Sequence, residues 1–91
     1  MIRTMEKIEV IKLLSEESRY NIFVKLLEFE GLCISELEGL VGLKQANLSK
    51  HMKRFKDLDI VESARTKNMI KYNIKDSFLS ENIDLIKYLM M

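Results

Sequence analysis

A run of polar and basic side chains in the middle of the chain has the composition of a nucleic-acid-reading surface. Its members are Gln45, Asn47, Ser49, Lys50, Lys53 and Arg54. Leu48, Met52 and Phe55 recur among them at intervals of four and three residues, which places the apolar side chains on one face of a helix. Side-chain amides can hydrogen-bond the edge of adenine, whereas Lys and Arg contact phosphates. We therefore expect the opposite, polar face to bind double-stranded DNA.

The distribution of charge also favours a polyanionic partner. The net formal charge of the 91 residues is only +1, but residues 44–75 hold nine Lys or Arg against three acids, a balance of +6. The remaining residues hold six bases and eleven acids, a balance of −5. A neutral protein with one basic third has the electrostatic footprint of a nucleic-acid-binding domain.

The polar face belongs to the second helix of a predicted helix-turn-helix at about 35–57. The first helix is expected to begin at Ser35, because Ser35 and Glu38 have the types and spacing of a capping box. Gly42 permits the sharp turn that ends it. The second helix is expected from residue 44 or 45 to residue 57.

After residue 59 the sequence pattern changes from helical to strand-like. A hairpin directly after a DNA-reading helix is the wing of a winged helix, which we place at about 60–74. Asn68 is the turn residue best suited to a left-handed backbone. Arg65 and Lys67 lie near the turn and are expected to contact phosphates.

Apolar residues also recur in the segments that flank this unit. We expect one helix at roughly 4–14, a second from Ser15, as its N-cap, to near Glu30, and a last helix at 77–91. The last helix carries two apolar lines, which is one more than it needs to dock on its own core. The surplus surface, together with part of the first helix, predicts a homodimer interface. Its residues are Met5, Ile8, Leu79, Ile83, Ile86 and Met90.

These elements define the expected fold class. It is mainly α with a small two-stranded β-hairpin, a winged helix-turn-helix of about five helices plus the wing. We expect residues 1–91 to form a single winged-helix domain, with the N- and C-terminal helices used for dimerisation, because no repeat, proline or low-complexity tract indicates a linker.

Three segments give the chain a resemblance to a known family. SEESRYNIF at 15–23 resembles the Asp-Pro-Thr-Arg-Leu-x-Ile-Leu segment of the ArsR-type winged-helix regulators, with Arg19 at the family's arginine. GLCISELEGLVGLKQANLSKHMKRFKDLDIV at 31–61 resembles the helix-turn-helix of that family, and IVESARTKNMIKYNI at 60–74 falls where the family has its wing. The resemblance implies a homodimeric operator-binding repressor with dimer contacts from the first and last helices.

The sequence departs from the metal-binding members of that family. Cys33 occupies the first position of their Cys-x-Cys pair, but Ser35 occupies the second. Asp76 begins the last segment, where other members use Asp and His, yet no histidine follows it. The usual wing glycine is also absent, with Asn68 nearest to its place. We therefore expect no metal site and no cofactor.

Cys33 and His51 each leave two interpretations. Cys33 is either a small buried hydrophobe or a thiol or metal sensor, and the nearby Glu36 and Glu38 disfavour the reactive thiolate. His51 either contacts DNA or packs partly buried beside Leu48 and Phe55, and the second reading is preferred.

Taken together, the residues favour a homodimeric, sequence-specific DNA-binding transcriptional regulator, a repressor at an inverted-repeat operator. The alternatives are a winged-helix protein-interaction module and a thiol- or metal-responsive repressor that uses Cys33. We expect no enzyme, because no Ser/His/Asp or Cys/His set and no glycine-rich phosphate loop can be placed. No apolar run approaches the ~18 residues of a membrane span. The expected location is cytoplasmic, with double-stranded DNA and a second copy as partners and no small-molecule ligand.

Overall fold

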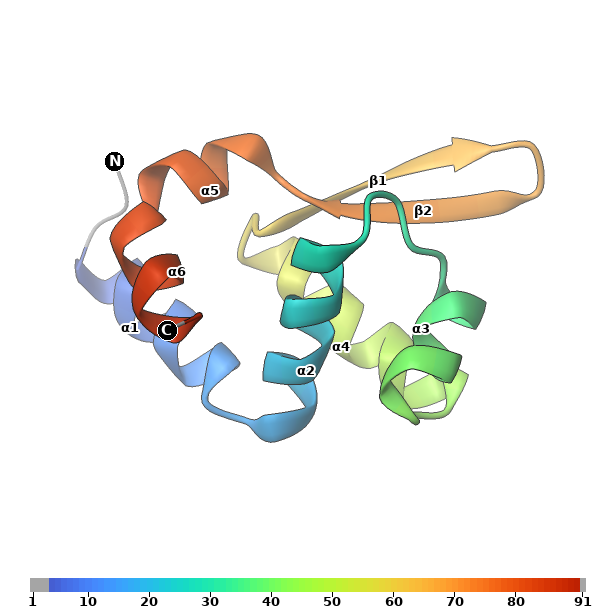
Figure 1. Ribbon diagram of the computed structural model, residues 1–91, viewed down its shortest axis with the longest axis horizontal. Coiled ribbons are helices and arrows are strands. Elements are labelled where there is room, and N and C mark those ends of the chain that lie inside the picture. Colours follow the sequence, from blue (N-terminus) through green and yellow to red (C-terminus); the bar gives the residue numbers. More distant parts are fainter. Residues whose placement is uncertain (1–3, 91) are drawn as a thin grey trace.

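The chain folds into six helices and one β-hairpin in a computed structural model that describes the backbone of residues 4–90 and the side chains of residues 7–90 (Figure 1). The elements in order are α1 (Thr4–Leu14), α2 (Glu17–Glu28), α3 (Ile34–Val41), α4 (Gln45–Asp57), β1 (Val61–Thr66), β2 (Met69–Ile74), α5 (Asp76–Glu81) and α6 (Ile83–Leu89). This architecture confirms the predicted winged helix-turn-helix, with one helix more than expected. Within the described residues, no helix is both long and apolar enough to cross a membrane.

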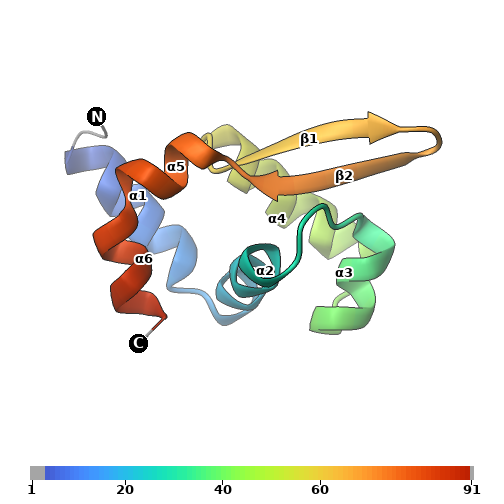
Figure 2. The same cartoon turned by 45° about the horizontal axis from the view of Figure 1, so that its top comes forward.

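Helix α2 lies at the centre of the molecule, between α1 and α6 on one side and the helix-turn-helix on the other (Figures 1 and 2). Its Phe23 is fully buried and joins three elements. The ring stacks on Phe55 of α4 with centroids 6.5 Å apart and meets Phe78 of α5 edge-on with centroids 6.1 Å apart. Offset-stacked and edge-to-face pairs are the favoured aromatic arrangements, so this trio fixes α4 and α5 against α2.

The two ends of α2 differ from the sequence prediction. The N-cap is Glu16, whose Oε2 accepts a hydrogen bond of 3.1 Å from the backbone N–H of Arg19. Ser15 instead donates its hydroxyl to the carbonyl of Lys12 at 2.8 Å, so its prediction as the cap was wrong. The helix ends at Glu28, two residues early, and Gly31 then turns the chain with a φ of 69°.

Helix α3 also begins earlier than predicted. Its N-cap is Cys33, and the carboxylate of Glu36 accepts a 3.0 Å hydrogen bond from the Cys33 backbone N–H. This bond lowers the pKa of Glu36, because it stabilises the charged carboxylate. The predicted Ser35–Glu38 box was therefore wrong by two positions. Gly42 does end the helix, with a φ of 72°, and α4 follows within its predicted bounds.

The C-terminal segment was predicted as one helix and forms two. The break lies at Asn82, a buried residue whose Nδ2 donates a 2.9 Å hydrogen bond to the carbonyl of Phe78. A side chain that bonds the backbone four residues back competes with regular helix and bends the chain. The break rotates the predicted apolar lines, so Ile86 (9% exposed) enters the core whereas Ile83 (48%) and Met90 (47%) lie outside.

The wing is a regular antiparallel hairpin whose register runs from Val61 opposite Ile74 to Thr66 opposite Met69. Its loop therefore consists of Lys67 and Asn68. Lys67, with a φ of 54°, adopts the left-handed backbone that was predicted for Asn68. Lys67 is the first residue of this two-residue loop, and the first residue needs a positive φ in both favoured turn types.

Replacing Phe23 with alanine is expected to cost about 3–5 kcal/mol of the free energy of unfolding, because it leaves a cavity at the junction of α2, α4 and α5. Urea unfolding followed by circular dichroism measures the change. Phe29→Ala provides the matched control, since Phe29 is exposed at the end of α2 and its removal should cost less than about 0.5 kcal/mol. Equal costs for the two variants would contradict the central role of Phe23.

Candidate nucleic-acid interface

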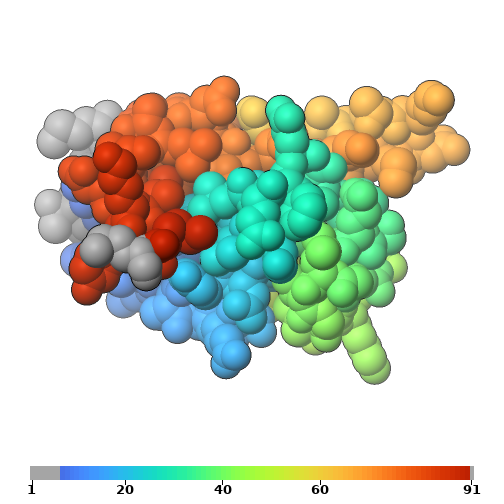
Figure 3. Space-filling view, viewed as in Figure 1, coloured from blue at the N-terminus to red at the C-terminus, as the bar shows by residue number. Residues whose placement is uncertain are grey.

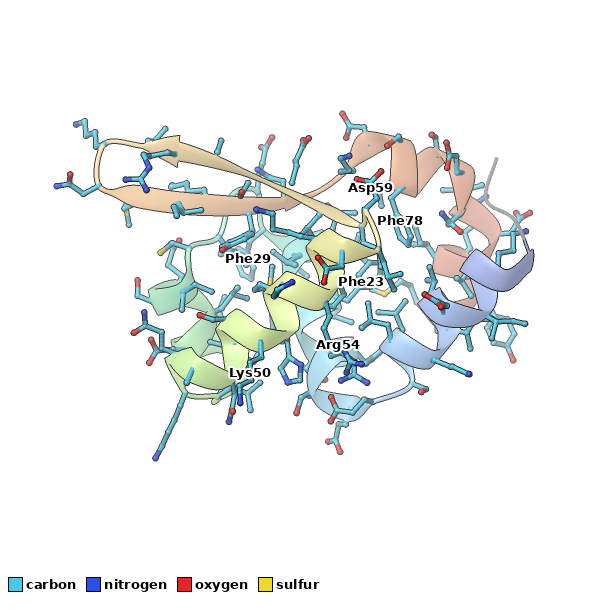
Figure 4. All side chains as sticks on the ribbon, turned by 180° about the vertical axis from the view of Figure 1, so that it is seen from behind. Phe23, Phe29, Lys50, Arg54, Asp59 and Phe78 are labelled. Atoms are coloured by element: carbon cyan, nitrogen blue, oxygen red, sulfur yellow. The ribbon has the colours of Figure 1, made fainter. Side chains whose placement is uncertain are left out.

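The exposed face of α4 carries most of the predicted DNA-binding side chains. Gln45, Asn47, Ser49, Lys50 and Lys53 are all exposed. The opposite face of the helix is fixed by its three buried apolar residues, as the sequence predicted. Figure 4 views the molecule from the side of α4, with Lys50 and Arg54 of that helix labelled. The arrangement leaves the amides and cations free to contact a groove without disturbing the core.

Two further cations of α4 lie at its sides. Arg54 is exposed but lines a hollow of about 350 Å³ together with Lys12 of α1 and Arg19 of α2. Lys56 points the other way, and its Nζ donates to the hydroxyl of Ser63 in β1 at 3.3 Å. The cationic surface therefore continues from α4 towards the wing, whereas on the side of α2 the acids Glu9 and Asp57 line the same hollow.

Lys53 is the one cation of the exposed face with an ion pair among the described residues. Its Nζ lies 3.2 Å from Asp57 Oδ2, and both side chains are largely exposed. Exposed pairs of this kind contribute little stability, typically below about 1 kcal/mol. Lys53 can therefore leave Asp57 for a phosphate at small cost.

His51 is half-buried at the edge of this face, on the side of α2. Its Nδ1 is buried without a hydrogen-bond partner. Burial lowers the pKa of His51, and the positive charges of Arg19 and Arg54 lower it further, whereas the Glu16 carboxylate acts in the opposite direction. The imidazole is therefore neutral near pH 7. These features fit the packing role that the sequence favoured.

The wing is attached to the loop before α3 by contacts that the sequence did not predict. Leu32 exchanges two backbone hydrogen bonds with Tyr72, at 3.1 and 2.8 Å, and the backbone N–H of Gly31 donates to Asn73 Oδ1 at 2.7 Å. Asp59 and Lys75 close the base of the hairpin through a 2.6 Å ion pair. These bonds hold the wing at a fixed angle to the helix-turn-helix.

Arg65 and Lys67 are both exposed towards the end of the wing. In the space-filling view the wing projects well beyond the rest of the molecule (Figure 3). The structure therefore places its two predicted phosphate contacts on a separate arm, away from α4.

Cys33 is buried, with its Sγ 3.1 Å from the Ser35 hydroxyl. Among the described residues, no three His, Cys, Asp or Glu side chains gather as metal ligands would. Burial at the N-cap of α3 agrees with the interpretation of Cys33 as a small buried hydrophobic residue.

The predicted dimer residues divide into three groups. Ile8 of α1 is exposed, as are Ile83 and Met90 at the C-terminal end. Leu79 is half-buried against the core, and Ile86 was wrongly assigned to the interface because its side chain is buried in the chain's own core. The side chain of Met5 lies outside the described residues.

Two exposed side chains extend this apolar surface beyond the predicted set. Ile11 of α1 and Tyr88 of α6 are both exposed, at 52% and 77%. The helical spacing of Ile8 and Ile11 is the sequence signal that identifies the first of them.

Lowering the pH from about 7.5 to about 5.5 should destabilise the protein, in part through His51. The pKa of His51 in the folded state is lowered, so the unfolded chain binds the proton first and is stabilised relative to the folded state as the pH falls through about 6.5. Glu16 and Glu36, whose pKa values are also lowered, titrate below this window. His51→Gln should flatten the pH dependence of the urea midpoint. A slope identical to that of the parent would exclude His51 as its source.

Comparisons with known proteins agree with this geometry. Residues 16–63, from the N-cap of α2 into β1, match the family described as "Bacterial regulatory protein, arsR family". The arsenical resistance operon repressor of Staphylococcus xylosus is 32% identical over 80 residues, which cover 85% of this chain and 76% of that protein. The structure of HlyU from Vibrio cholerae aligns with a TM-score of 0.79 at 22% identity, over 94% of this chain and 92% of that one, and shows the shared fold.

A second curated relative is longer than this chain. The cadmium resistance transcriptional regulatory protein CadC of Listeria innocua serovar 6a is 29% identical over 65 residues, which cover 71% of this chain but only 55% of that protein. The chain thus spans about half the length of this relative.

The matches confirm the expectation of a regulator rather than an enzyme. By the match to its helix-turn-helix and by its likeness to the Staphylococcus repressor, the chain belongs to the arsR family of bacterial regulatory proteins.

Proposed function

We propose that the chain is a homodimeric, sequence-specific DNA-binding repressor that acts in the cytoplasm at an inverted-repeat operator. The observation that carries the proposal is the exposed face of α4, where amides and lysines stand opposite a fully buried apolar stripe. Family membership supports the same reading, and one relative is itself named a repressor. Repression follows if the bound protein excludes polymerase from the promoter.

The side chains of α4 divide by their chemistry. Gln45 and Asn47 lie in the first turn of the helix, the end that approaches base edges in a helix-turn-helix, and their amides can read adenine through its N6 and N7 atoms. Lys50 and Lys53 carry no base-specific pattern and are assigned to phosphates. The wing cations would then contact the backbone next to the groove that α4 occupies.

The apolar surface of α1 and α6 supports the dimer. The two helices lie side by side at the end of the molecule opposite the wing (Figures 1 and 2). Their exposed Ile8, Ile11 and Ile83 would be removed from water by a second copy, and burial of such side chains drives association. A two-fold axis there would present two α4 helices to successive major grooves, which calls for half-sites about one helical turn apart.

The assignment of roles on α4 predicts two distinguishable phenotypes. Lys50→Ala/Lys53→Ala should weaken binding to all duplexes alike and reduce the slope of log affinity against log salt by about 0.9 for each phosphate that is no longer neutralised. Asn47→Ala should instead relax sequence preference at one position and leave that slope unchanged. Fluorescence anisotropy on matched and mismatched duplexes at several salt concentrations separates the two. If both variants behave alike, the division of roles is wrong.

The proposed dimer interface predicts that a charge at Ile83 separates the subunits. Ile83→Lys should convert the dimer to monomers in sedimentation equilibrium and weaken operator binding by at least about tenfold, since two linked half-site contacts become independent. Phe29→Lys is the control, because Phe29 is similarly exposed but lies at the far end of α2. A dimer that persists in Ile83→Lys would place the interface elsewhere.

A further inference from the structure

The end of the wing exposes two large apolar side chains that the proposed phosphate contacts do not use. Met69 is 44% exposed and Ile70 is 41% exposed, whereas the next three residues of β2 are half-buried. Both follow the hairpin loop directly, at the part of the wing farthest from the helices (Figure 3). They are therefore separate from the apolar surface of α1 and α6.

The surroundings of these two side chains are cationic. Residues 63–75 include four Lys or Arg and no Asp or Glu. Arg65 is the direct cross-strand partner of Ile70, and Lys67 precedes Met69 by two residues. A protein partner with an apolar surface and charges of both signs around it would gain no affinity from these four cations. A DNA groove offers the complementary pattern, since phosphates line its edges and sugars form its walls.

The geometry of the strand suits a groove with two walls. Neighbouring residues of a strand point to opposite faces, so Met69 and Ile70 project from the two sides of one narrow ribbon. The bonds of Leu32 to Tyr72 and of Gly31 to Asn73 hold the base of that ribbon against the helix-turn-helix. The ribbon is therefore presented to DNA already ordered, and binding costs little conformational entropy.

We propose that Met69 and Ile70 enter the minor groove beside the site of α4 and pack against its sugars and base steps, bending the duplex. This inference rests on the proposed DNA binding and adds a source of specificity to it. Apolar side chains inserted in the minor groove widen it and partly unstack a step, and the energy required depends on the sequence deformed. The wing thereby selects flexible flanking sequence without hydrogen bonds to base edges.

Salt dependence separates this apolar contact from the cationic contacts of the same wing. Met69→Ser/Ile70→Ser leaves every charge in place, so it should weaken operator binding about tenfold while the slope of log affinity against log salt stays that of the parent. Arg65→Ala/Lys67→Ala should lower that slope. Leu40→Ser is the matched control, because Leu40 is 39% exposed and faces α2 and α6 rather than the wing.

The bend and its sequence dependence give a second readout. Duplexes labelled at both ends report bending by fluorescence energy transfer, and the parent should shorten the end-to-end distance more than the Ser/Ser variant. The parent should also prefer a pyrimidine–purine step under the wing over a stiff A-tract, and this preference should disappear in the variant. If the double variant is unstable in thermal melts, Met69→Ser alone should show the same effects at about threefold.

Three results would overturn the inference. The first is unchanged affinity and bending in the Ser/Ser variant, and the second is a weaker affinity accompanied by a lower salt slope. The third is a change of molecular mass in sedimentation without an effect on DNA, which would assign the two side chains to a second copy. If the parent protein binds no duplex, the proposed function itself is overturned. This result differs from the three above, in which the parent still binds DNA.

Discussion

The contact of Phe23 with Phe55 and Phe78 is the constraint on which the arrangement of this protein depends. Phe55 is the last buried residue of α4, and Phe78 is the one buried aromatic of α5 among the described residues. A single ring of α2 therefore contacts both α4 and the first of the C-terminal helices. Helix α4 buries three side chains, and its polar face follows from how these three pack.

The wing depends on a different kind of contact. Few of its side chains are buried, so packing alone would leave it free to swing. Backbone hydrogen bonds of Leu32 and the Asn73 carboxamide hold it instead. Glycine is favoured at position 31, because its φ of 69° lies in the left-handed region that residues with a side chain rarely adopt. The loop before α3 thus positions both the helix-turn-helix and the wing.

The sequence predicted those features that arise within one element. Leu48, Met52 and Phe55 determined the buried face of α4, and hence which polar residues are exposed, because helical periodicity is local. The start of α3 was harder to predict, since Cys33–Glu36 and Ser35–Glu38 have the same spacing, and the pairing of the preceding Leu32 with Tyr72 has no local signal. The hydrogen bond of Asn73 to Gly31 spans 42 residues and has no local signal. The side-chain hydrogen bond of Asn82 likewise splits the last helix, and apolar periodicity gives no signal of such a bond. Ile86 was for this reason predicted at the dimer interface instead of in the core.

The central claim is that two copies of this chain place two α4 helices on one duplex, with the wings on its flanks. Hydroxyl-radical footprinting of the protein on a duplex selected from random sequence measures this directly. The account predicts two protected regions related by two-fold symmetry, their centres about ten base pairs apart, with weaker protection outside each from the wing. A single asymmetric region of protection, or none on any selected duplex, would contradict it.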